Sequence, residues 1–349
     1  MEKKRFLKKF SSQNNYDSQK DSVMGMPHVV LLEDTNEVVY TSENNEDEID
    51  YSKEYFIIEA LEDGLTVQLS QNASKYRIDN GEWMSLDADT ATPLINSGQK
   101  ISFKITNPAI SSFYGIGTFT VNKAFNVEGN IMSLHYGDDF EGQTDLSGKD
   151  CAFYVLFSNC TTLQNAENLI LPATTLADDC YSNMFNGCTS LTTAPELPAT
   201  TLADDCYSNM FNGCTNLTEA PQLPATTLAD YCCFYMFNGC TSLTTAPQLL
   251  ATTLVSGCYN SMFDGCTSLT TAPQLLATTL VSECYNSMFN GCSNLNHIKM
   301  LATDISASYC LGDWVNGVAS NGTFVKNASM TSLPSGIHGI PEGWTVENA

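Results

Sequence analysis

The fold is decided by residues 171–196, which read LPATTLADDCYSNMFNGCTSLTTAPE. Nearly the same segment follows directly as LPATTLADDCYSNMFNGCTNLTEAPQ, and then as LPATTLADYCCFYMFNGCTSLTTAPQ. Two further copies start at Leu249 and Leu275 with LLATTLVS. A fixed period of this length predicts units that stack on one another, because none of them can close a hydrophobic core alone.

Within each unit, the residue types predict a short helix followed by extended segments. Cys180, Tyr181, Met184 and Phe185 would share one face of that helix, so we expect them in the core. The TTAP and ATTL segments are β-branched and should pair with the same segments of the next unit. The expected N-caps are Asp178, Asp204, Asp230, Ser256 and Ser282, and the expected helix ends are Gly187, Gly213, Gly239, Gly265 and Gly291.

These features together predict an α+β multidomain protein: a small antiparallel β-sandwich followed by a leucine-rich-repeat solenoid of 26-residue units with a C-terminal cap. We expect an N-terminal anchor over residues 1–50, the sandwich over 51–135, the solenoid over 136–299 and the cap over 300–349. The pattern is degenerate before residue 171 and is lost from His297 onward. Trp314 and Trp344 are predicted to cover the open end.

The chain has 14 cysteines, whose spacing argues against a disulfide framework or a zinc site. Two cysteines recur in each unit, eight residues apart, which on a helix separates them by roughly 12 Å and exceeds the reach of a disulfide. No CxxC pair or Cys/His cluster has metal-ligand spacing. We therefore expect buried, reduced thiols that act as small core residues.

Residues 54–134 read as six short alternating segments, typical of a small antiparallel sandwich. Asn80-Gly81 is a two-residue hairpin signal, and Trp83 is a candidate core residue. The segments are YFIIEAL, LTVQLS, YRIDNGEWMSL, KISFKIT, IGTFTVN and KAFNVEGNIMSL.

The first fifty residues combine a basic tail, a hairpin and an acidic linker. PHVVLLEDTNEVVYTS reads as two strands around a turn at Asp34–Asn36, and SENNEDEIDYSKE as an extended linker. A hairpin is marginally stable alone, so this one either docks on a partner or extends the edge of the sandwich. The candidate anchoring residues are Val29, Val30, Leu31, Leu32, Val38, Val39 and Tyr40.

The net charge of -24 makes nucleic acid a poor partner. No Lys or Arg occurs between Leu169 and Ile298, so that region has nothing to neutralise phosphates. No run approaches 18 apolar residues, and no hydrophobic run follows the charged opening residues. We therefore expect neither membrane insertion nor a signal peptide, and synthesis in a cytoplasm.

The CTSLTTAP and LPATTL runs resemble those of BspA-like leucine-rich-repeat proteins over roughly residues 150–300. EGQTDLSGKD before the repeats, and LATDISA, NGTFVKN and GIPEGWTV after them, are similar to segments of repeat proteins encoded by gut Bacteroidota and their phages. PHVVLLEDTNEVVY looks like the opening of phage fibre proteins from the same bacteria. The resemblance implies a surface-displayed recognition function.

Catalytic and metal chemistry find little support in the sequence. The four histidines are scattered, and none lies in a nucleophile, metal or phosphate-loop motif, so we expect no enzyme and no cofactor. Asp178-Asp179 and Asp204-Asp205 suggest stacked calcium ligands, but Ser replaces Asp in later units. Helix capping explains both residue types, so we expect no metal site.

The third unit carries the candidate binding residues Tyr231, Phe234 and Tyr235. They replace the Asp, Ser and Asn of the first two units and would form an exposed aromatic stripe on the predicted helix. Exposed aromatic side chains are typical of binding hot spots and of surfaces that stack sugars. Neutral drift and an oligomer contact are the alternatives.

These observations lead to three hypotheses. In the first, the chain is a head or tail fibre or decoration protein on a phage virion; residues 1–50 bind a capsid or tail protein, and the repeats bind a host-surface glycan or protein. The second is a BspA-like adhesin on the bacterial cell surface. The third is a purely structural capsid decoration without a receptor. The oligomeric state stays open.

Overall fold

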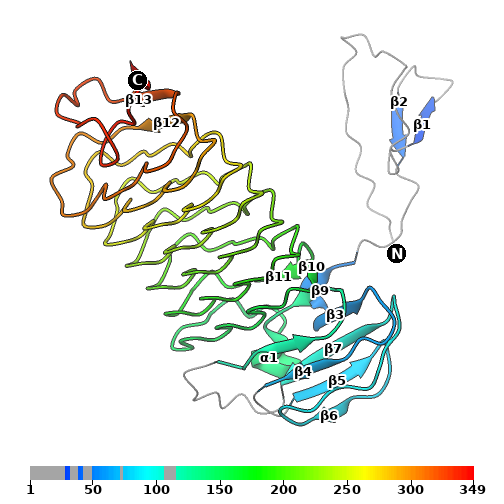
Figure 1. The fold of residues 1–349 in the computed structure, drawn as a ribbon. Coiled ribbons are helices and arrows are strands. Elements are labelled where there is room, and N and C mark those ends of the chain that lie inside the picture. Colours follow the sequence, from blue (N-terminus) through cyan, green and yellow to red (C-terminus); the bar gives the residue numbers. More distant parts are fainter. Residues whose placement is uncertain (1–27, 32–37, 42–48, 71–73, 106–114) are drawn as a thin grey trace. The chain divides into compact units, whose positions relative to one another are not determined.

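The computed structural model describes residues 28–31, 38–41, 49–70, 74–105 and 115–349 (Figure 1). The chain divides into two compact units, residues 1–50 and residues 51–349. In the first unit, β1 (His28–Leu31) pairs antiparallel with β2 (Val38–Thr41), and Val30 lies opposite Val39. The predicted pairing of these segments is confirmed, whereas Leu32 and the predicted turn lie outside the described residues.

The second unit begins with a seven-stranded sheet of order β10-β9-β3-β7-β5-β6, in which β11 also pairs with β9. A separate pair, β4 (Val67–Leu69) with β8 (Phe119–Val121), is antiparallel. Each of the six predicted segments contains a strand. The sheet strands are β3 (Phe56–Ala60), β5 (Ser74–Ile78), β6 (Met84–Leu86), β7 (Lys100–Ile105), β9 (Phe125–Asn130), β10 (Leu163–Asn165) and β11 (Leu169–Ile170).

The hairpin between β5 and β6 differs from the prediction. The last cross-strand pair is Tyr76 with Met84, so the loop is longer than Asn80-Gly81 alone. Trp83 is half-buried rather than in the core. Its ring lies under two cations, with Arg77 Cζ 5.0 Å and Lys104 Nζ 4.4 Å from the ring centroid. These contacts hold the ring at the surface of the sheet.

The sheet is mixed rather than antiparallel, and its parallel strands connect it to the repeats. On one side β9 pairs antiparallel with β3, and on the other it pairs parallel with β10 and β11. Parallel pairing needs a long connection between strands, which the first degenerate unit supplies. The predicted antiparallel sandwich is therefore wrong.

The predicted fold class is also wrong. Among the described residues the only α-helix is α1 (Ser133–Tyr136), accompanied by the single 3-10 turns η1 (Tyr51–Lys53) and η2 (Gly137–Asp139). The 26-residue units consist of turns and isolated bridges, with the strand β12 (His297–Met300) at the end of the last unit, where a short helix was predicted in each. The chain forms a sheet-rich fold in which the units, here called coils, follow one another along the molecule (Figure 1).

Backbone conformation explains why the predicted helix is absent. In the coil of residues 171–196, Asp179, Asn183 and Gly187 have φ angles of 55°, 57° and 73°. A left-handed residue at every fourth position is incompatible with a right-handed α-helix. Asp, Asn and Gly are the residue types that tolerate this conformation. The residues read as an N-cap region and a helix stop are therefore turn residues.

The hydrogen bonds of this segment alternate between two directions. Even-numbered residues close turns within their own coil, as when the Ser182 N–H donates to the Asp179 carbonyl at 3.0 Å. Odd-numbered residues donate to the following coil, as when the Asn183 N–H reaches the Ser208 carbonyl at 2.8 Å. This pattern satisfies buried backbone groups that a helix would have paired internally.

A column of aromatic rings forms the core through the coils. Phe185 and Phe211 stack with centroids 5.4 Å apart and planes at 5°, and Phe211 and Phe237 stack at 5.5 Å and 2°. The column starts with Phe119 of β8, whose ring packs against Phe56 of the seven-stranded sheet, and ends on Trp314, which is fully buried. The same core therefore runs from the sheet to the C-terminal end.

All fourteen cysteines are free and buried, which confirms the predicted burial of the thiols. The second cysteine of each coil donates its S–H to a phenylalanine carbonyl of the preceding coil, as with Cys240 and Phe211 at 3.1 Å. Burial raises the pKa of Cys240 to about 12. Such thiols stay protonated and act as packing groups.

The C-terminal end consists of three parallel strands, β12 (His297–Met300), β13 (Thr323–Lys326) and β14 (Thr345–Asn348). Both predicted covering residues are buried, and both indole N–H groups find carbonyl partners. Trp314 Nε1 donates to Gly339 at 2.9 Å, and Trp344 Nε1 donates to Ala319 at 2.7 Å.

Candidate binding surface on the coils

The last coil is one residue shorter than the others, and this changes its backbone. Thr271 bridges to His297, whereas Leu275 bridges to Met300. The two partners are therefore one residue closer along the chain in the second bridge than in the first. Pro273 has no counterpart, because Ile298 is buried like Ala272 and Lys299 occupies the place of Gln274. Proline cannot donate to a sheet ladder, so its loss allows the regular strand β12 to form.

Strand geometry then places His297 and Lys299 on one face. Burial alternates along β12, with Ile298 and Met300 fully buried and the two basic side chains half-buried. Residues two apart on a strand point the same way and lie roughly 7 Å apart. His297 and Lys299 therefore stand side by side on the outside of the last coil.

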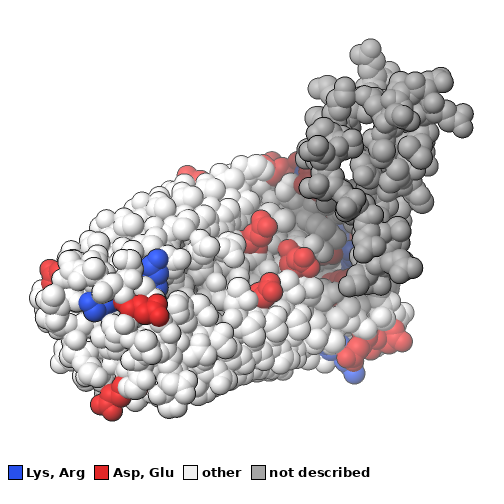
Figure 2. Space-filling model, turned by 90° about the horizontal axis from the view of Figure 1, so that it is seen from above, with Lys and Arg blue, Asp and Glu red and all other residues white. Residues whose placement is uncertain are grey.

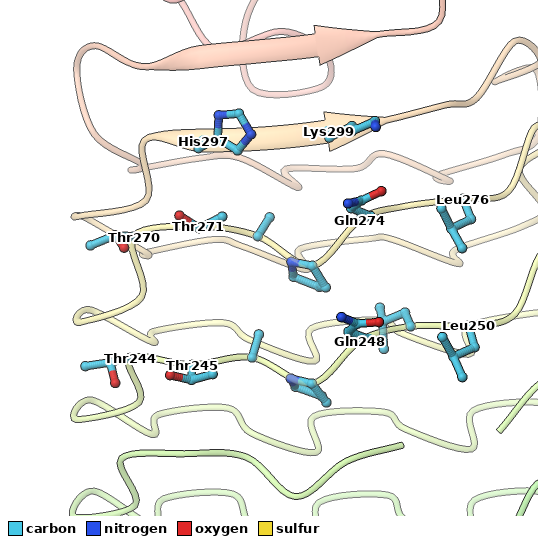
Figure 3. A pocket seen from close by; sticks show the side chains of 15 residues that line it. Thr244, Thr245, Gln248, Leu250, Thr270, Thr271, Gln274, Leu276, His297 and Lys299 are labelled. Atoms are coloured by element: carbon cyan, nitrogen blue, oxygen red, sulfur yellow. The ribbon is translucent and has the colours of Figure 1, made fainter. Parts of the chain in front are cut away.

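The two basic residues border a groove of about 460 Å³ that extends over the two preceding coils. Figure 3 shows Gln248, Gln274 and Lys299 in one column, with Thr271 and His297 in another. Neighbouring rungs of such a ladder lie about 4.8 Å apart. The groove therefore presents the same polar groups at regular intervals and ends in two basic side chains.

The polar groups of the groove are open to a ligand. Gln248 and Gln274 are exposed, and within the described part of the chain neither amide has a side-chain hydrogen bond. Lys299 likewise has no carboxylate within ion-pair distance among the described residues. Leu250 supplies an apolar wall and is 42% exposed.

The predicted aromatic residues lie elsewhere, on the turn side of the third coil, and they form a cluster. Phe234 packs edge-on against Tyr231, with centroids 5.7 Å apart, and against Tyr235 at 4.3 Å. All three side chains are half-buried, so the expected exposed stripe is wrong in that respect. The helix that would have displayed them is absent.

Tyr231 has a packing role that the sequence did not reveal. A Cβ at Gly257 would lie 2.3 Å from Tyr231 Cε1, so the ring rests where the next coil has no side chain. Its hydroxyl reaches Glu283 Oε2 two coils away at 3.4 Å. Tyr231 thus spans three coils.

The predicted anchoring residues are placed only in part. Val29, Val30 and Leu31 lie in β1, and Val38, Val39 and Tyr40 lie in β2. Leu32 is outside the described residues. The anchoring role of these residues stays a prediction.

Asp178, Asp204 and Asp230 occupy the same position in three successive coils and form an acidic row, and Figure 2 shows a face with few charges, most of them acidic. Burial raises the pKa of the Asp205 carboxyl to about 6, and the nearby Asp179 carboxylate adds to the effect. Within the described residues, no group of three or more His, Cys, Asp or Glu side chains is arranged to hold a metal ion. The acidic row therefore gives the calcium hypothesis no support.

Sequence reasoning missed His297 and Lys299 as site residues. The detectable signal was the loss of proline between TTAPQLLATT and NHIKMLATD, together with the first Lys after a long segment without one. Only the bridges between coils show which positions these residues occupy.

Comparison with protein-family models found no match, and searches of curated proteins and of solved structures found no significant similarity. In the described residues, no helix has the length and apolar character needed to cross a membrane.

Proposed function

We propose that this chain is a virion fibre or decoration protein of a phage that binds a host-surface glycan or protein through its coils. Residues 1–50 would attach it to a capsid or tail protein, and residues 51–349 would present the binding surface. In this role the chain would display a binding surface and would have no catalytic activity.

One observation carries this proposal: the coils keep their core while their surface changes. Met184, Phe185 and their equivalents are fully buried in every copy, whereas partly exposed or exposed positions change from Asn183 to Tyr235 and from Gln274 to Lys299. A constant stack that varies at chosen surface positions is the way repeat proteins build binding surfaces. The resemblance of the opening segment to phage fibre proteins supports attachment to a particle.

A BspA-like adhesin on the bacterial surface would use the same binding surface at another location. Mass spectrometry of purified particles, and of washed membranes from uninfected host cells, distinguishes the two. We expect the chain in the particles at tens of copies each. Detection on host membranes alone would contradict the virion proposal.

A decoration protein without a receptor is the remaining alternative, and the packing of Tyr231 against Gly257 favours a structural role for that residue. Phe234→Ser and Tyr235→Asn, which copy Ser182 and Asn183, leave Tyr231 in place. If the cluster binds the host, particles with both substitutions adsorb more slowly while the purified chain keeps its melting temperature. Unchanged adsorption would argue against a receptor function of the cluster.

A further inference from the structure

We propose that the groove ending at His297 and Lys299 binds an oligosaccharide that carries one carboxylate, and that Lys299 pairs with this carboxylate. The inference rests on the proposed binding function of the coils and names the ligand class of one site. The argument depends on the charge, the hydrogen-bonding groups and the position of the groove.

Charge selects an anion at one end of the groove. The aligned outer column reads Glu196, Gln222, Gln248, Gln274 and Lys299 along the chain, so it changes from acidic to basic. His297 adds a second basic group beside Lys299. No other Lys, Arg or His occurs between residues 169 and 299. A carboxylate is therefore favoured at β12.

The rest of the chain limits how much negative charge the ligand can carry. The net charge is -24, and the opposite end of the column has Glu196, with Glu219 on the neighbouring column. Neither carboxylate lines the groove, but a polyanion that continued beyond the groove along the same columns would meet both. The charge pattern therefore fits a ligand with a single carboxylate and a neutral remainder.

The neutral part of the groove matches sugar hydroxyls. Exposed Gln amides offer both donors and acceptors, and the Thr hydroxyls of the neighbouring column offer the same, at regular intervals. Leu250 and Leu276 give an apolar wall against which the C–H face of a sugar ring can pack. Earlier coils have Pro198 and Pro224 at these positions. The Leu walls and the basic end thus occur in the same part of the stack.

The chain supplies its own replacements for a test. Lys299→Gln and His297→Thr install the residues that the preceding coils carry in the same columns, so the backbone and core should be unchanged. Lys123→Gln is the control for the loss of one positive charge, because Lys123 lies in the bend between β8 and β9, far along the chain from the groove, and its ion-pair partner among the described residues is the exposed Glu62 at 3.7 Å. Equal melting temperatures would show that all variants fold alike.

The probes are oligosaccharides that end in a hexuronic or a nonulosonic acid, each paired with its carboxyl methyl ester, measured by calorimetry on the full chain. We expect acid forms to bind, and esterification and Lys299→Gln each to weaken binding by about tenfold, the usual scale of one charge-assisted hydrogen bond. Lys123→Gln should leave binding unchanged. Raised salt should weaken binding of the acid forms only.

Three outcomes would overturn the inference: no acid form binds, the esters bind equally well, or Lys299→Gln has no effect. Binding of host protein alone, or self-association abolished by Lys299→Gln, would assign the groove another occupant. Particle mass spectrometry separates this failure from that of the proposed function. If the chain is present in virions but does not bind these sugars, only the ligand assignment is contradicted. If it binds them but is absent from virions, only the proposed virion role is contradicted.

Discussion

At the scale of single residues, the coils depend on positions that hold left-handed backbone. Asp179, Asn183 and Gly187 are suited to it, but in the third coil Tyr231 and Tyr235 adopt φ angles of 53° and 52°. Bulky residues rarely adopt this conformation, so their surroundings must compensate. For Tyr231 the compensation is its ring packing over Gly257.

That packing predicts a strong coupling between the two residues. Gly257→Asn tolerates the left-handed backbone but brings a side chain into the Tyr231 ring, and we expect it to cost about 1–3 kcal/mol of unfolding free energy. Adding Tyr231→Asp, which copies the first two coils, should restore most of the loss. A double-mutant cycle by chemical denaturation measures the coupling, and additive effects would show that the ring does not occupy this space.

The half-buried Asp205 predicts a pH effect of defined sign. Because its pKa is raised to about 6, the folded chain holds a proton that the unfolded chain releases near pH 4. Stability from this group is therefore lost as pH rises through 6. Asp205→Asn should raise the melting temperature at pH 7 by about 1–3 °C and have less effect at pH 4. A lower melting temperature at pH 7 would contradict this sign.

At the scale of elements, the junction between the sheet and the first coil contains a buried histidine. His135 in α1 is 4% exposed and meets Phe153 edge-on at 5.1 Å. Burial lowers its pKa to about 4, and the Lys149 ammonium adds to this effect. Charging His135 therefore works against the contact between α1 and the coil.

The pH dependence of stability that His135 causes has the opposite sign to that of Asp205. The unfolded chain binds the proton near pH 6.5 and the folded chain only near pH 4, so stability is full above pH 6.5 and falls as pH drops. The loss amounts to about 3 kcal/mol at most. His135→Leu should remove this loss of stability at low pH. Unfolding curves of the variant and the unchanged chain at pH 7 and pH 4 would measure the difference. If the variant lost as much stability between pH 7 and pH 4 as the unchanged chain, His135 would not be the cause.

At the scale of the whole molecule, the coils form a linear array in which each contacts mainly its neighbours. The coil of residues 197–222 is nearly identical to the one before it, so its removal joins compatible surfaces. We expect this deletion to fold with a melting temperature a few degrees lower. Removing residues 320–349 takes away Trp344 and exposes the end of the core, so that chain should aggregate.

Circular dichroism and size-exclusion chromatography of both deletions test this expectation. A coil deletion that fails to fold would mean that the stack is a single cooperative block with no exchangeable units. A truncated chain that stays monomeric with an unchanged melting temperature would show that the C-terminal strands do not protect the core.

The sequence by itself determined the period, the identity of the buried residues and the strands of residues 54–134. Cys180, Tyr181, Met184 and Phe185 were predicted to face inward, and all four are buried. These features are readable because burial depends on the residue type itself, and stacking repeats the same choice in every unit.

Only the tertiary structure decided the path of the backbone between those core residues. Asp178 to Gly187 satisfies the local rules for a capped helix, but every second N–H donates to the next coil, and that partner lies nearly a whole repeat further along the chain. The β9 pairing and the alignment of Lys299 with Gln274 also depend on hydrogen bonds between distant segments. Local sequence cannot distinguish turns that pair with a neighbouring coil from a helix that pairs with itself, because both bury the same side chains.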